Sequence, residues 1–62
     1  MFKISDFKIG DRIQLHPAMD LWMAGARYGD VVNLGSKLVH VQLDKLKRQT
    51  RVYPKDIMEI IT

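Results

Sequence analysis

The segment Val39-His40-Val41-Gln42-Leu43 decides the fold, because its side chains alternate between apolar and polar. Alternation with a period of two is typical of a β-strand that buries one face and exposes the other. A polar turn over residues 44–48 follows, and a second short strand is predicted over residues 49–52. The centre of the chain is therefore predicted to be a β-hairpin.

Three more strands are predicted outside this hairpin. Residues 29–34 contain β-branched side chains and lead into the turn pair Gly35-Ser36, and residues 57–61 form the last strand. The first strand spans residues 11–15. Its apolar side chains occupy odd-numbered positions, as does the preceding Ile9. That parity predicts an inward face for Ile9, Ile13 and Leu15, and an outward face for Arg12, Gln14 and His16.

The connections between these strands are short, with one exception. Residues 16–28 form a long loop, in which Gly25 and the flanking Pro17 and Gly29 limit any helix over residues 19–27 to one turn. Tyr53-Pro54-Lys55-Asp56 is predicted to be a single turn before the last strand, because proline cannot donate a ladder hydrogen bond.

Five short strands in so short a chain can bury one continuous face only if the sheet curls. We therefore predict an all-β fold, a five-stranded small barrel with one long loop after the first strand and a single turn before the last. Residues 1–62 form one domain, with residues 1–6 as a short N-terminal extension. Phe2, Ile4 and Phe7 are expected to make core or self-association contacts.

Length and composition exclude several classes of protein. The 62 residues contain no cysteine, which removes disulfides, thiolate metal sites and a cysteine nucleophile. No apolar run approaches the roughly 20 residues that span a bilayer, so we expect no membrane partner. The amino terminus lacks the charged-then-apolar layout of a signal peptide, so we expect a cytoplasmic protein.

The residues that could support catalysis are scattered. Neither Ser5 nor Ser36 lies in a phrase that pairs it with a histidine, and the seven acidic residues fall mostly at turns and strand ends. His16 and His40 have no acid at a metal-ligand spacing. We therefore expect no enzyme, no catalytic residue, no cofactor and no metal site.

The order of these elements resembles the SH3-like small β-barrel over residues 7–61. Phe7-Lys8-Ile9-Gly10-Asp11-Arg12-Ile13 is similar to the entry strand of such barrels, where a Gly-Asp pair makes the turn into the first strand. Tyr28-Gly29-Asp30-Val31, with Leu34, resembles the Gly-x-Val phrase of KOW-type domains. That resemblance implies contact with RNA or ribosomal partners.

Two narrower resemblances imply different functions. Pro17, Trp22, Gly29 and Val31 follow an order similar to that of ferredoxin-docking photosystem barrels. Gly10-Asp11-Arg12-Ile13 and Val52-Tyr53-Pro54 resemble type II dihydrofolate reductases, which implies a tetrameric enzyme as an alternative. Arg51 stands at the position of that family's pore-lining glutamine, so a tetramer would place four arginines where the substrate pair stacks.

The basic residues point to an anionic partner. Lys45, Lys47, Arg48 and Arg51 lie within seven consecutive residues, in a chain of net charge +3. If Val41 pairs with Val52 and Leu43 with Thr50 on the inner face, then Gln42 faces Arg51 and His40 faces Tyr53 on the outer face. Arginine matches phosphate geometry, and tyrosine can stack on a base. An alternative interpretation is a solvated turn whose lysines protect an edge strand from aggregation.

Trp22 has two interpretations. It can fold back over the open end of the barrel, or Leu21-Trp22-Met23 can form an exposed patch that binds protein. Our first hypothesis is a binding module that contacts nucleic acid without sequence specificity, through Lys45, Lys47, Arg48 and Arg51 with support from Arg12 and Tyr53. The alternative is an adaptor that docks on an acidic protein surface through the Trp22 loop and the basic turn. The oligomeric state is not predicted.

Overall fold

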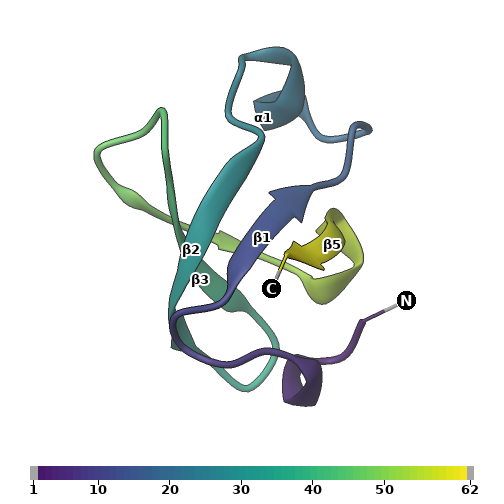
Figure 1. The fold of residues 1–62 in the computed structure, drawn as a ribbon. Coiled ribbons are helices and arrows are strands. Elements are labelled where there is room, and N and C mark those ends of the chain that lie inside the picture. Colours follow the sequence, from purple (N-terminus) through teal and green to yellow (C-terminus); the bar gives the residue numbers. More distant parts are fainter. Residues whose placement is uncertain (1, 62) are drawn as a thin grey trace.

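The computed structural model describes residues 2–61, which form five strands and three short helical turns. The helical turns are η1 (Ile4–Asp6), α1 (Asp20–Met23) and η2 (Pro54–Asp56). The strands are β1 (Arg12–Leu15), β2 (Tyr28–Leu34), β3 (Val39–Leu43), β4 (Gln49–Val52) and β5 (Ile57–Ile61). Figure 1 shows their arrangement.

All five strands belong to one antiparallel sheet with the order β4-β3-β2-β1-β5. The last strand returns to pair with the first, and β4 crosses the direction of β1 and β2 in Figure 1, so the sheet is strongly curled. Its two edges, β4 and β5, do not pair with each other in the described chain, so the barrel is not closed by hydrogen bonds. The predicted all-β fold of five strands is confirmed.

The core lies on the inner face of this curled sheet. Ile13 and Leu15 on β1 and Val39, Val41 and Leu43 on β3 are all at most 1% exposed. They alternate with polar neighbours, as the period of two predicts. The remaining buried hydrophobic residues are Phe7, Ala26, Val31, Val52 and Ile57.

The chain before β1 differs from the prediction at one position. Ile9 was expected on the inner face, but 66% of its surface is exposed. The alternation breaks because Gly10 adopts a φ of +99°, a left-handed conformation that turns the chain into β1. Phe2 packs against the core with its ring 5.6 Å from that of Phe7, and Ile4 also packs there. Met1, the first residue of the predicted extension, lies outside the described residues.

The predicted register of the β3–β4 hairpin is wrong by two residues. Val39, not Val41, pairs with Val52, and Arg51 therefore lies opposite His40 instead of Gln42. The last ladder pair is Gln42 with Gln49. A shift of two residues leaves every side chain on its predicted face, because side chains alternate with that same period.

Hydrogen bonds at the end of β3 hold the turn that follows it. The backbone N–H of Asp44 donates to the carbonyl of Tyr28 at 3.0 Å, which holds the chain against β2. The side-chain amide of Gln42 donates to the carbonyl of Leu46 at 2.6 Å, which closes the turn from within. Both contacts lie where the ladder with β4 ends, at the pair Gln42 with Gln49.

Gly29 on β2 generates a prediction about packing. A Cβ atom there would lie 2.8 Å from the carbonyl oxygen of Gln42 and 2.9 Å from Cδ2 of Leu43, both on the adjacent β3. We expect Gly29→Ala to lower the free energy of unfolding by about 1–3 kcal/mol, because the two strands must separate to admit the methyl group. Urea denaturation measures this loss. Gly35→Ala is the control, since its nearest neighbours would lie at 3.4 Å; an equal loss in both variants would contradict the account.

Candidate functional site

The turn between β3 and β4 and the strand that follows it carry a cluster of free cations. Lys45, Lys47, Arg48 and Arg51, here called the basic hairpin, are all exposed. Every ion pair within residues 2–61 involves Arg12, so no side chain of the basic hairpin is paired with a described acid. Figure 1 shows the turn extending away from the body of the molecule, where a large ligand can reach it.

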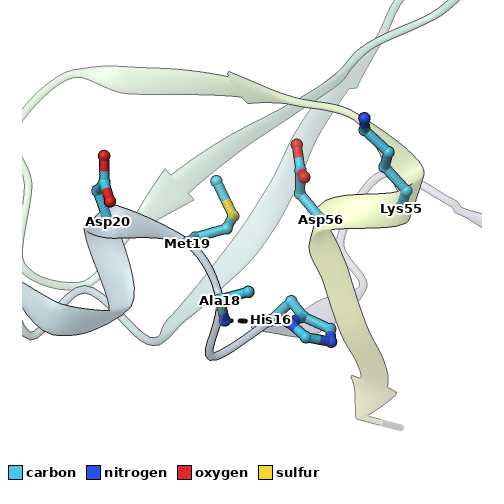
Figure 2. Close-up of a pocket in the computed structure, with 6 residues that line it drawn as sticks. All are labelled: His16, Ala18, Met19, Asp20, Lys55 and Asp56. Atoms are coloured by element: carbon cyan, nitrogen blue, oxygen red, sulfur yellow. Dashed lines mark hydrogen bonds between the residues drawn. The ribbon is translucent and has the colours of Figure 1, made fainter.

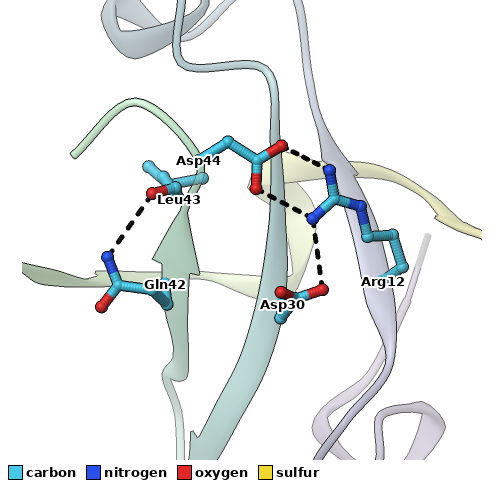
Figure 3. A network of polar contacts seen from close by, with 5 residues as sticks. All are labelled: Arg12, Asp30, Gln42, Leu43 and Asp44. Carbon is cyan, nitrogen blue, oxygen red and sulfur yellow. Dashed lines mark hydrogen bonds and ion pairs between the residues drawn. The ribbon is translucent and has the colours of Figure 1, made fainter. Parts of the chain in front are cut away.

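Arg12 on β1 pairs with two acids, one of which lies at the start of the turn that carries the basic hairpin. Its guanidinium donates two hydrogen bonds to the carboxylate of Asp44, one of them at 2.8 Å. It also donates to Asp30 at 3.2 Å, and Figure 3 shows the guanidinium directed at both carboxylates. Asp44 is the first residue after β3 and Asp30 lies on β2, so Arg12 joins two strands to the base of the turn.

This network changes the acid–base properties of its members. The hydrogen bonds from Arg12 hold the pKa of Asp44 below its ordinary value, with a smaller contribution from the charge of Lys45. The hydrogen bonds to Asp44 and then Asp30 raise the pKa of Arg12. Arg12 was predicted to support phosphate binding, but its guanidinium is already occupied by two carboxylates. We therefore assign it to positioning the turn.

The outer face of the sheet continues the site beyond the basic hairpin. His40 lies opposite Arg51, and both point outward because Val52 and Val41 point inward. Tyr53 follows directly after β4 with 52% of its surface exposed. The ammonium group of Lys55 lies 5.6 Å from the centre of the Tyr53 ring, so the single turn η2 brings this cation back over the ring.

Lys55 was not predicted as a site residue, because the sequence assigned it only to a turn. The sequence does contain a signal for Lys55, since it follows Tyr53 by two positions and a tight turn between them can bring the two side chains together. Proline at position 54 favours such a turn. The exposed cations near Tyr53 therefore include Lys55 in addition to the predicted Arg51.

Two hollows lie where the long loop meets η2. The larger, of about 460 Å³, is lined by His16, Ala18, Met19, Asp20, Lys55 and Asp56. Figure 2 shows the carboxylates of Asp20 and Asp56 directed to one side of it and the His16 ring on the other. The smaller hollow, of about 380 Å³, is lined by Phe2, His16, Pro54, Lys55, Ile57 and Met58.

His16 is shared by both hollows and is held in one orientation. The backbone N–H of Ala18 donates to its Nδ1 at 3.0 Å, and its own backbone N–H donates to the carbonyl of Asp56. Since Nδ1 accepts a hydrogen bond, the neutral ring carries its proton on Nε2. In that form the Nε2–H group is the donor that this hydrogen bond leaves for a ligand. The strand parity predicted only that His16 points outward.

The Trp22 loop offers little exposed apolar surface. Trp22 and Leu21 are half-buried and pack against the core, and the guanidinium of Arg27 lies 4.8 Å from the centre of the Trp22 ring. Met23 is 82% exposed. Of the three residues predicted to bind protein in the alternative hypothesis, Met23 alone presents most of its surface to solvent.

The described chain offers no cluster of metal ligands. Residues 2–61 contain no group of three or more His, Cys, Asp or Glu side chains arranged to hold a metal ion. Within the same residues, no helix has the length and apolar character needed to cross a membrane.

The Arg12 network predicts a pH dependence of stability. Because the pKa of Asp44 is lower in the folded chain than in the unfolded chain, its ionised form stabilises the fold above about pH 4. That contribution disappears as the pH falls through the folded-state pKa. We expect Asp44→Asn to lower the melting temperature at pH 7 and to reduce the difference between pH 7 and pH 2.5. Asp20→Asn is the control, and an identical pH profile for both variants would argue against the network.

The packing of Trp22 predicts a difference between neighbouring residues. We expect Trp22→Ala to lower the free energy of unfolding by about 1–3 kcal/mol, less than the loss of a fully buried tryptophan. Met23→Ala, at an exposed position of the same helical turn, should change it by less than about 0.5 kcal/mol. Thermal and urea denaturation measure both values. A Trp22→Ala variant as stable as the parent would restore this loop as a candidate docking surface.

Comparisons of the chain with models of protein families, with curated proteins and with solved structures find no match. The function must therefore be inferred from the chain's own residues and geometry.

Proposed function

We propose that this protein is a non-catalytic module that binds nucleic acid through its phosphate groups. The basic hairpin is the observation that carries the proposal: its four cations are exposed and none is paired with a described acid. Arginine presents a planar fork that matches a phosphate group, and lysine provides a mobile point charge. A net charge of +3 favours an anionic partner for the chain as a whole.

The Arg12 network supports the same proposal. Asp44 is adjacent in sequence to Lys45, and as a free anion it would offset one charge of the basic hairpin. Arg12 binds that carboxylate, so Asp44 is not paired with a cation of the basic hairpin. Within the described residues, Asp30 and Asp44 are therefore paired with Arg12, whereas the four cations of the basic hairpin are unpaired.

The contacts available favour binding without sequence specificity. Phosphate contacts position a nucleic acid but do not read its bases, and no described helix is long enough to enter a major groove. His40 and Gln49 add hydrogen-bonding groups on the same outer face. The resemblance of residues 28–31 to KOW-type domains agrees with a nucleic-acid partner. We propose the cytoplasm as the compartment.

The exposed cations also suit two roles that need no nucleic acid. β4 is an edge strand, so its one cation, Arg51, and the cations of the adjoining turn would hinder pairing with another chain, a role that requires no ligand. A docking adaptor would use the Trp22 loop as its anchor, but Trp22 packs against the core. A binding experiment with charge-matched variants distinguishes both roles from phosphate binding.

We predict that the triple variant Lys47→Glu, Arg48→Glu, Arg51→Glu loses binding to a fluorescein-labelled 12-mer of thymidylate in fluorescence anisotropy at 50 mM salt. The melting temperature should not fall, because all three side chains are exposed and unpaired. For the parent chain, log K should fall with log salt at a slope of about −3, the value for four contacts on a single strand.

The matched control is Lys3→Glu, Lys8→Glu, Lys37→Glu, which makes the same change in net charge at exposed positions outside the basic hairpin. It should retain most of the affinity. Equal loss in both triple variants would mean that net charge alone drives association, and unchanged binding in the hairpin variant would eliminate the proposed interface.

A further inference from the structure

The basic hairpin continues without interruption into an exposed aromatic ring and a hollow. Arg51 and Tyr53 both point outward because Val52 between them is buried, and Tyr53 has an extended backbone. Two residues of extended strand place their side chains roughly 6.6 Å apart on the same face. The ring of Tyr53 is therefore adjacent to the last cation of the basic hairpin.

Lys55 connects this ring to the smaller hollow. Its ammonium group lies 5.6 Å from the centre of the Tyr53 ring, and its side chain also lines the hollow of about 380 Å³. Pro54, between them in sequence, lines the same hollow. The ring, the cation and the hollow thus form one surface at η2.

The lining of the smaller hollow suits an uncharged planar group held next to an anion. Phe2, Ile57 and Met58 provide apolar contacts, while Lys55 and His16 add polar side chains that can donate hydrogen bonds. No acidic residue of the described chain lines it. The larger hollow differs, because Asp20 and Asp56 lie on its wall and would repel a phosphate group (Figure 2).

Resting on the proposed function, we infer that the nucleic acid bound here is single-stranded: one base stacks on Tyr53, a neighbouring base enters the smaller hollow, and Lys55 contacts the phosphate that links them. Duplexes keep their bases paired and stacked inside, so they cannot present a base face to Tyr53. Single strands present every base, and stacking on an aromatic ring tolerates any sequence. The next phosphates of the strand lie along β4, from Tyr53 back to the turn, where the basic hairpin contacts them.

The test uses three fluorescein-labelled probes of equal length: a 12-mer of thymidylate, a 12-base-pair duplex, and a 12-mer of abasic deoxyribose phosphate. Anisotropy titrations at 50 mM salt give the affinity of each probe. We expect thymidylate to bind at least fivefold more tightly than the abasic strand, which has the same phosphates but no bases, and more tightly than the duplex.

Two pairs of variants locate the bases. Tyr53→Ala should weaken thymidylate binding by about 5- to 100-fold and leave abasic binding unchanged, while Tyr53→Phe should retain the parent affinity. Met58→Glu places a carboxylate in the smaller hollow and should also weaken thymidylate binding. Met23→Glu makes the same change at an exposed residue of α1 and should not.

Failure of this inference is distinguishable from failure of the proposed function. Equal affinity for thymidylate and abasic strands, or tighter binding of the duplex, would overturn the single-strand inference and leave phosphate binding by the basic hairpin intact. Unchanged thymidylate binding by both Tyr53→Ala and Met58→Glu would do the same. Absence of binding to all three probes would overturn both proposals.

Discussion

Burial of one apolar face is the constraint on which the rest of this structure depends. Five short strands have no disulfide to stabilise them, so their inward side chains must cover one another, and the sheet curls to achieve this. Val41 and Leu43 on β3 and Ile13 on β1 become almost completely buried as a result. The same alternation sends every second residue outward, and the polar surface is therefore a direct consequence of how the core is formed.

The outward charged residues of β1, β2, β4 and the β3–β4 turn form two groups, one with ion-pair partners and one without. Arg12 on β1 is paired with Asp30 on β2 and with Asp44 at the start of the β3–β4 turn, and it thereby joins both strands to the base of that turn (Figure 3). Beyond that network the described cations of the turn and β4 have no acid partner. This separation of paired acids from unpaired cations is the basis of the proposed phosphate-binding surface.

Much of the fold could be predicted from the sequence, because a period of two fixes both strand position and strand face. The strands at Val39–Leu43, Gln49–Val52 and Ile57–Ile61 have the predicted bounds. The hairpin register could not be predicted, because a shift of two residues leaves the apolar and polar faces unchanged and the alternation therefore does not distinguish the two registers. The candidate site shows the same limit. The cations of the basic hairpin can be located from the sequence alone. The ion pairs of Arg12 cannot, because they join residues that are distant in the sequence.

The central claim is that the surface from the basic hairpin to η2 is where this protein meets its ligand. Backbone amide resonances followed by two-dimensional NMR during titration with a 12-mer of thymidylate test it most directly. The account predicts saturable shifts over residues 45–55 and at His16, with α1 (Asp20–Met23) nearly unchanged. Shifts concentrated on α1 and the rest of the long loop, or none at saturating oligonucleotide, would contradict it.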